Sequence, residues 1–270
     1  MSSTALSILR GLIFIVPAIL HSIGIFLLSQ GTKRKQLNGV SYIFLFALSA
    51  SELAYCILAI IECPFYVHDL NSSTVFYIEL FKNGTIFVYI LLVMIIITVD
   101  RFLIAYYNVR YTEIWNLKKA LFVVIFPMVT CIVLFLVIAL THSSYDAIRE
   151  TFSLYIWIIG DYVNLVIFVL TYVYILKKYG MRRSKRSIRP TSINNKPLQE
   201  VETSEDKRRK IMYTSFIITF IVFVVVPDQI SFVLAINGHE VTQIVDFFLT
   251  VMYMVGLCLD AVIYVWCLKI

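Results

Sequence analysis

Seven long apolar runs divide the chain, and they restrict its fold more than any other feature of the sequence. The runs cover approximately residues 8–29, 40–66, 75–100, 117–140, 152–176, 211–236 and 244–268. Each is long enough for a helix to cross a bilayer, which takes roughly 20 apolar residues. Regular alternation of apolar and polar side chains is absent, so helices and not a barrel satisfy the backbone in lipid. The sequence predicts an all-α membrane protein, a seven-transmembrane helix bundle that forms a single domain over 1–270.

Composition supports an integral membrane protein and excludes several other classes. Hydrophobic residues make up 60% of the chain and charged residues only 15%, whereas a soluble domain of this size needs far more polar surface. The net charge of +6 does not indicate nucleic-acid binding, because the basic residues cluster in gaps between apolar runs. The sequence contains no catalytic triad, phosphate-binding loop or metal-ligand spacing, so we expect no enzyme activity and no organic cofactor.

The distribution of Lys and Arg sets the orientation of the predicted spans. Twelve of the 23 basic residues lie in the polar segment 177–210, and most of the others follow the first and third runs. Because cytoplasmic loops carry an excess of Lys and Arg, we expect the amino terminus outside and the carboxyl terminus inside. Segment 177–210 is then a flexible basic cytoplasmic loop, whose basic flanks suit either anionic lipid or the surface of a partner protein. The glycosylation sequon at Asn71 falls in an outer loop, where it can be modified.

Two charged residues stand side by side where the third run ends. The sequence there reads Asp100-Arg101-Phe102, and Val109-Arg110-Tyr111 follows after six further residues. Charges are costly in hydrocarbon, but at the cytoplasmic end of a span their side chains reach the interface. The orientation therefore explains how this pair is tolerated.

Other runs carry features that belong with this motif. The second run reads "LSASEL" and contains Glu52, and the last reads "DAVIY", which holds Asp260 and Tyr264. Tyr172 lies in the fifth run and Pro227 in the sixth. The chain resembles the rhodopsin-like G-protein-coupled receptors in these motifs, in the depth of each motif within its span, and in the predicted topology. It is identified as a divergent member of that family. The resemblance covers essentially the whole chain.

The resemblance implies a multi-pass receptor of the plasma membrane that binds an extracellular ligand and passes the signal to a heterotrimeric G protein. It implies that Arg101 contacts the G protein and that Asp100 holds this arginine in the inactive state. Activation would release Arg101 toward Tyr172 and Tyr264. Phe102 stands where the family most often has Tyr.

Glu52 and Asp260 are carboxylic acids deep within apolar runs. A buried acid that finds no partner takes up a proton or binds an ion. The resemblance places both residues in the cluster where many members of the family bind sodium. Three interpretations stay open, namely a bound sodium ion, a proton shared by the two carboxyls, and structural hydrogen bonding.

The outer halves of the runs hold the candidate ligand contacts, in a pocket that the resemblance places among spans 3, 5, 6 and 7. The candidates are Asn83, Phe87, Trp157, Asp161, Asp228, Gln229, Phe232 and Asp246. Several acids and no base facing the bundle in this half predict a cationic or polar ligand. Lys82 is expected to pair with Glu79, three residues before it. Pro227 removes a backbone hydrogen bond and is expected to kink span 6.

Departures from the family pattern keep two alternative functions open. Span 1 lacks the family's Asn, span 6 lacks its Trp, and the cysteines that would tie down the outer 4–5 loop are missing. These differences suit a non-signalling receptor-like protein. A third function, an ion-coupled transporter, would use the acids in the runs as an ion path. Those acids are Glu52, Asp161, Asp228 and Asp260. The chain has no internal repeat, which many transporter folds contain.

Overall fold

The structure is a computed structural model of the whole chain. It describes residues 3–33, 39–67, 73–107, 115–141, 162–171, 173–174, 177, 223, 226–227, 230, 234 and 243–268. The named elements within these ranges are all helices. They are α1 (Ser3–Lys33), α2 (Gly39–Val67), α3 (Ser73–Phe81), η1 (Lys82–Phe87), α4 (Val88–Tyr107), α6 (Leu117–Thr141) and α11 (Gln243–Leu268).

Within the described residues, four helical segments are long and apolar enough to cross a membrane. They are Ile8–Gln30, Tyr42–Phe65, Thr74–Asp100 and Leu117–Leu140, and shorter apolar helices cover Tyr162–Thr171 and Phe247–Ile263. Each of the four long segments begins and ends within two residues of an apolar run in the sequence. The described part of the chain is therefore all-helical, as predicted, and has the character of a membrane protein.

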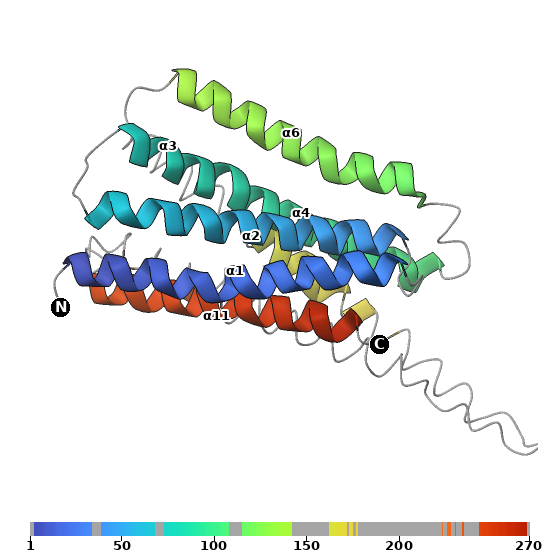
Figure 1. Cartoon of the computed structure of the whole chain (residues 1–270). Helices are drawn as coiled ribbons and strands as arrows, with labels where there is room; N and C mark the ends of the chain where they lie inside the picture. Colours follow the sequence, from blue (N-terminus) through green and yellow to red (C-terminus); the bar gives the residue numbers. More distant parts are fainter. Residues whose placement is uncertain are drawn as a thin grey trace, which may run out of the picture.

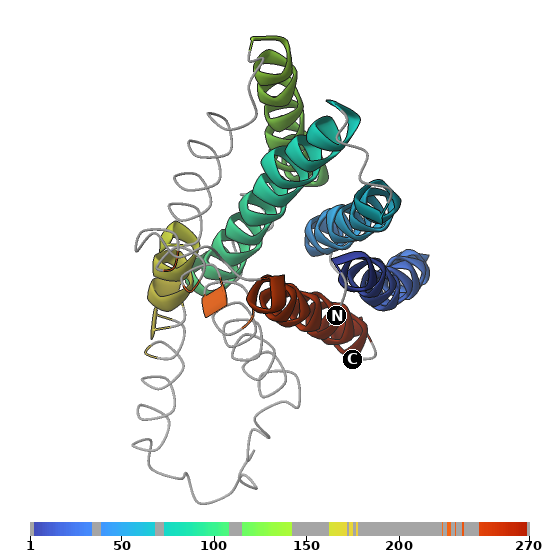
Figure 2. The same ribbon diagram turned by 90° about the vertical axis from the view of Figure 1, so that its left-hand side faces the viewer.

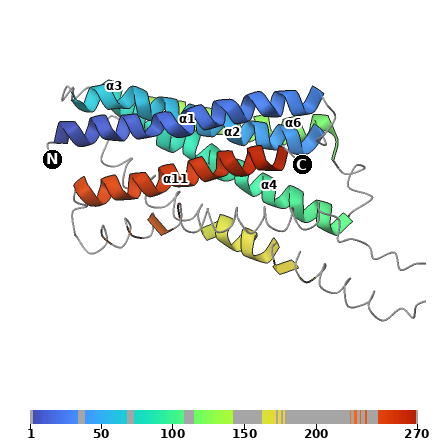
Figure 3. The ribbon, with the colours of Figure 1, turned by 60° about the horizontal axis from the view of Figure 1, so that its bottom comes forward.

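The helices run along a roughly common direction, and the last described helix lies beside the first (Figure 1). α11 packs against α1, α1 packs against α2, and α2 packs against α4. A view turned by 90° shows α6 on the outer side of this group (Figure 2). α1 and α11 point the same way, so α1 begins at one end of the bundle and α11 finishes at the other (Figures 1 and 3).

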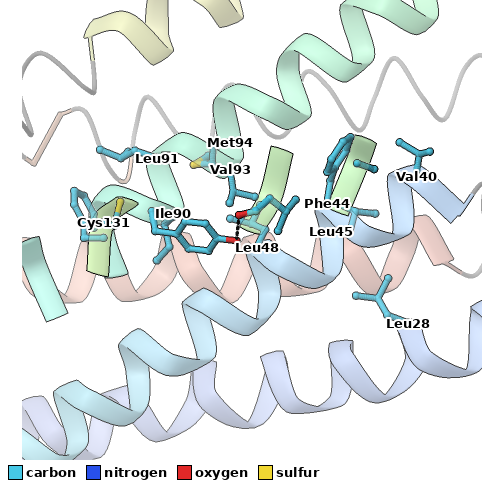
Figure 4. Close-up of a cluster of buried hydrophobic side chains, with 14 of the residues drawn as sticks. Leu28, Val40, Phe44, Leu45, Leu48, Ile90, Leu91, Val93, Met94 and Cys131 are labelled. Carbon is cyan, nitrogen blue, oxygen red and sulfur yellow. Dashed lines mark hydrogen bonds between the residues drawn. The ribbon is translucent and has the colours of Figure 1, made fainter. Parts of the chain in front are cut away.

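Buried side chains from α2, η1, α4 and α6 form the main apolar core. Leu48 of α2 lies close to Val93 and Met94 of α4, with Phe44 farther along the same helix (Figure 4). Leu48 and Val93 are fully buried. Because lipid tails are as apolar as these side chains, van der Waals packing and not transfer from water holds such helices together. The fit between α2 and α4 therefore matters more than the area that they bury.

Small residues let α1 and α2 approach each other closely. A Cβ atom placed on Gly11 would lie 2.6 Å from Sγ of Cys63, whereas one on Gly24 would lie 3.5 Å from Oγ of Ser49. Cβ of Cys63 would lie 2.8 Å away as well and cannot rotate aside, so a larger residue at position 11 would force this part of α1 and α2 to shift. Glycine at helix interfaces is a common device for close packing in membranes. The same interface brings polar residues of the two helices into contact.

η1 interrupts the third long helix with a π-helical segment. The flanking residues Phe81 and Val88 have ordinary α-helical backbone angles, with φ of −67° and −59°. A π-helical turn takes in one more residue than an α-helical turn, and such turns often occur at functional sites. Its buried residues are Lys82, Thr85 and Phe87, so η1 directs a lysine into the bundle.

α6 is the most exposed of the four long helices. In its most apolar 18-residue stretch only 11% is buried, whereas 33% to 50% is buried in the corresponding stretches of the other three helices. Exposed apolar side chains such as Phe122, Phe126 and Leu140 lie along it, which suits a helix that faces lipid. Asn116 caps its start, where its side-chain oxygen accepts the backbone N–H of Lys119 at 2.9 Å.

Candidate functional site

Three titratable side chains from three helices meet in the middle of the bundle. His21 comes from α1, Glu52 from α2 and Asp260 from α11, with exposed fractions of 0%, 1% and 7%. The Nδ1 atom of His21 lies 3.2 Å from Oγ of Ser49 and 3.5 Å from Oε2 of Glu52. The carboxyls of Glu52 and Asp260 are close enough to interact electrostatically. We call His21, Glu52 and Asp260 the core triad.

The surroundings of the core triad are apolar or only weakly polar. Its imidazole faces the backbone of Leu257 in α11, and the thiol of Cys56 lies near both Glu52 and Cys258. Oε2 of Glu52 and Oδ1 of Asp260 have no hydrogen-bond partner among the residues that the structure describes. Net charge in such a place is strongly unfavourable. The triad therefore needs protons or a cation to balance its two acids.

His21 is the functional candidate that sequence reasoning missed. The sequence singles out Glu52 and Asp260, and the structure places His21 beside Ser49 and beside Glu52, which interacts electrostatically with Asp260. The first apolar run lacks the Asn of the rhodopsin-like pattern, yet it contains this one histidine. An imidazole in the middle of an otherwise apolar run was the available signal, because polar residues inside membranes are rarely without a role.

A second polar cluster lies in the predicted outer half, between α2 and η1. Lys82 forms an ion pair with Glu62, and both side chains are buried. Nζ of Lys82 lies 5.9 Å from the centre of the Tyr55 ring, within the range of a cation–π contact. The Tyr55 hydroxyl lies 3.5 Å from Oδ1 of Asn83. This ion pair joins two helices through charges that are removed from solvent.

The Lys82–Glu62 ion pair corrects an expectation from the sequence. The prediction that no base faces the bundle in the outer half is wrong, because Lys82 is buried against α2. Spacing along one helix points to Glu79 as its partner, but it says nothing about a carboxylate on a neighbouring helix. With a base present, the excess of acids no longer supports a cationic ligand.

Aromatic rings gather around Tyr55 beside this ion pair. The ring centres of Phe14, Phe87 and Tyr253 lie 6.2, 6.2 and 5.4 Å from that of Tyr55. Phe87 and Tyr253 lie 5.8 Å apart, so α1, α2, η1 and α11 all contribute. These separations are typical of aromatic pairs in protein cores. Two of the predicted ligand contacts, Asn83 and Phe87, thus lie together at this junction.

The Asp100-Arg101-Phe102 motif lies on α4, and its acid is fully buried. The ring of Phe102 lies 4.9 Å from that of Tyr174 and 5.8 Å from that of Tyr106. Tyr106 and Tyr174 are 6.1 Å apart. Tyr174 belongs to the fifth apolar run, so these contacts join that run to the end of α4. The side chain of Arg101 is outside the described part of the chain.

Several predicted site residues lie outside the described residues. They are Asn71, Trp157, Asp161, Tyr172, Asp228, Gln229 and Phe232, together with nearly all of 177–210. Asp246 and Tyr264 lie on α11, but their side chains are not described. Pro227 is a buried residue in a helical position. The glycosylation site, the span 6 kink and the role of the cytoplasmic loop stay predictions.

Comparison with known proteins leaves these sites to be interpreted from their own geometry. No protein-family model matches the sequence, and no curated protein matches it. The core triad, the outer ion pair and the aromatic contacts at the end of α4 therefore carry the functional argument.

Proposed function

We propose that the chain is a rhodopsin-like receptor of the plasma membrane, which binds a ligand outside and engages a heterotrimeric G protein inside. The observation that carries this proposal is the surroundings of Asp100-Arg101-Phe102. A fully buried acid precedes the arginine, and Phe102 packs on Tyr174 from the fifth run. The motif lies where two spans meet, at the end of the bundle that the positive-inside rule assigns to the cytoplasm. A charged motif at this position suits coupling to a cytoplasmic partner.

The direction of the helices supports seven crossings. Consecutive crossings alternate in direction, so α6, the fourth, runs opposite to α1. α11 runs parallel to α1 (Figure 3) and therefore opposite to α6. Between two spans of opposite direction the chain can cross the membrane either not at all or an even number of times. The apolar runs at 152–176 and 211–236 supply two, and the apolar helix Tyr162–Thr171 lies in the first of them.

The contacts of α11 support a bundle whose last span closes onto its first two. α11 packs on α1 and also contacts α2, and the core triad places one titratable group on each of these three helices. In a receptor, a rearrangement of the last span would have to break and remake these polar contacts. The relative positions of these three spans therefore depend on whether the triad holds protons or an ion.

The ligand of the proposed receptor enters from the outer half, where Asn83 and Phe87 lie. The nearest described charges are the paired Lys82 and Glu62, and three aromatic rings surround that of Tyr55. An aromatic wall with one ion pair suits a ligand that has an apolar body and a polar group. We expect lipid to surround the remaining outer surface of the bundle.

A cell assay with a charge-removal variant tests the receptor proposal. The wild type and Arg101→Ala are expressed with each class of heterotrimeric G protein, and basal and ligand-driven coupling are measured. Loss of a charge-assisted contact should lower coupling by roughly tenfold or more, with unchanged surface expression. Lys118→Ala is the matched control, because Lys118 is an exposed base on the same side of the bundle. It should retain coupling.

The same assay separates the receptor from its alternatives. A wild type that reaches the cell surface but engages no G protein, across a broad ligand panel, would contradict the proposal and favour a non-signalling receptor-like protein. The buried acids of the core triad are the observation that favours the second candidate, an ion-coupled transporter. Ion flux through wild-type vesicles that disappears in Asp260→Asn would support that function instead.

A further inference from the structure

The core triad contains a group that the sequence pattern of two acids does not include. His21 is fully buried, and its Nδ1 atom lies between Oγ of Ser49 and Oε2 of Glu52, at 3.2 and 3.5 Å. A cation held by these two oxygens would have to share them with the imidazole. The imidazole therefore occupies the space next to Glu52 that a bound ion would need.

The imidazole within 3.5 Å of Glu52 makes the surroundings of that carboxyl less suited to a hard cation such as sodium. Hard cations are held by several oxygen atoms, whereas imidazole nitrogen suits transition metals. Within the described ranges, no three His, Cys, Asp or Glu side chains are grouped so that they could hold a metal ion. The titratable groups that face the triad there are Cys56 of α2 and Cys258 of α11, and neither supplies an oxygen.

Protons can balance the charge of the core triad without any metal ion. A protonated imidazole contributes one positive charge and each ionised carboxyl one negative charge. Two protons shared among His21, Glu52 and Asp260 therefore give a cluster with no net charge, whichever two groups carry them. A proton that leaves the imidazole for the Glu52 carboxylate neutralises both groups, so transfer between α1 and α2 leaves the total unchanged. Neutrality matters because the surroundings are apolar.

We propose that the core triad is a proton-binding site in place of a metal site, with two protons shared among His21, Glu52 and Asp260. The three groups sit on α1, α2 and α11, so the distribution of the protons depends on how these helices are placed. Uptake or release of a proton then changes the balance between arrangements of the bundle. This site does not depend on the receptor proposal, because it would operate in any function that moves these helices.

Infrared spectroscopy of the purified protein in lipid nanodiscs tests the protonation of the triad. At neutral pH we expect carbonyl-stretch absorption from a protonated carboxylic acid in the wild type. Because either acid can carry a proton, the band should shift in frequency or fall in intensity in Asp260→Asn and in Glu52→Gln. Glu79→Gln is the control, because Glu79 lies on α3, away from the triad, and it should leave the band unchanged. Absence of such a band in the wild type would mean that both acids are ionised, and would overturn the proposal.

Thermal unfolding provides an independent test that needs no substitution. The midpoint of the wild type is compared in sodium chloride and in choline chloride at equal ionic strength. We expect the two midpoints to coincide, because a bound ion would raise the midpoint in sodium by several degrees. A sodium-dependent rise in the wild type that is lost in Asp260→Asn would refute the proposal.

Removal of the imidazole tests the role assigned to His21. His21→Ala opens the space beside Ser49 and Glu52, so the midpoint of this variant should rise in sodium relative to choline. If it does not, the imidazole is not what excludes the ion, and the role assigned to His21 is wrong. Ser22→Ala is the matched control on the same helix, because its hydroxyl bonds to the backbone of Ala18 in an exposed position. It should show no sensitivity to sodium.

Discussion

Breaking the ion pair between Lys82 and Glu62 gives a quantitative test of the outer half of the structure. Lys82→Met keeps a side chain of similar length and removes the charge that faces Glu62, which is only 4% exposed. Removing one partner of a buried ion pair destabilises a protein by about 3–5 kcal/mol. The contact of Lys82 with the Tyr55 ring at 5.9 Å adds about 0.5–1 kcal/mol.

The double variant Lys82→Met/Glu62→Gln separates the ion pair from simple packing. Each single change leaves a buried charge that has lost its counterpart, whereas the double change leaves none. We therefore expect the double variant to recover most of the stability that either single variant loses. At roughly 2–4 °C of midpoint for each kcal/mol, Glu62→Gln should unfold about 6–20 °C below the wild type. Lys82→Met, which also loses the contact with the Tyr55 ring, should unfold about 7–24 °C below it.

Thermal unfolding in lipid nanodiscs, followed by circular dichroism, measures these differences. Lys118→Met removes a charge at an exposed position, so it should stay within about 0.5 kcal/mol of the wild type. The reasoning fails if the double variant loses as much stability as the two single variants combined. That result would mean that the two side chains act independently and that the pair in the structure has no energetic coupling.

Two further predictions concern packing within the bundle. Gly11→Ala should lower the unfolding midpoint by several degrees, because its Cβ would lie 2.6 Å from Sγ of Cys63. Gly24→Ala should be nearly neutral, because the nearest contact of its Cβ would be 3.5 Å away. Equal effects of the two variants would contradict the close approach of α1 and α2. Val93→Ala should cost about 1 kcal/mol, since Val93 is fully buried against α2 and its contacts are lost. Val99→Ala, at a 38% exposed position on the same helix, should cost much less by the same measurement.

The class of fold was accessible from the sequence because crossing a bilayer requires long apolar helices. Thr74–Asp100 is a clear example, since its limits differ from the apolar run by no more than one residue. Such features follow from local composition and from the fixed thickness of hydrocarbon. The acid at the end of that run, Asp100, is fully buried in the structure, whereas the sequence predicts that its side chain reaches the interface.

The partners of the polar residues were not accessible in the same way. Sequence spacing points from Lys82 to Glu79, yet Lys82 pairs with Glu62, twenty positions earlier on another helix. His21 escaped notice for a similar reason, because its importance comes from Glu52, 31 positions later in the sequence and 3.5 Å away in space. Local periodicity describes one helix at a time, whereas both contacts arise where two helices meet.

The π-helical segment makes the third long helix behave as two helices whose faces are set separately. Deletion of one residue from η1 would restore α-helical periodicity and turn α3 by about 100° relative to α4. The inner portion, with Asp100, would keep its register against α2 and α6, while the outer rim would present a different set of side chains. A single deletion at Asn83 or Gly84 would therefore change which side chains α3 presents, while the motif at the other end stays in place. The two ends of this helix are in that sense free to diverge independently in evolution.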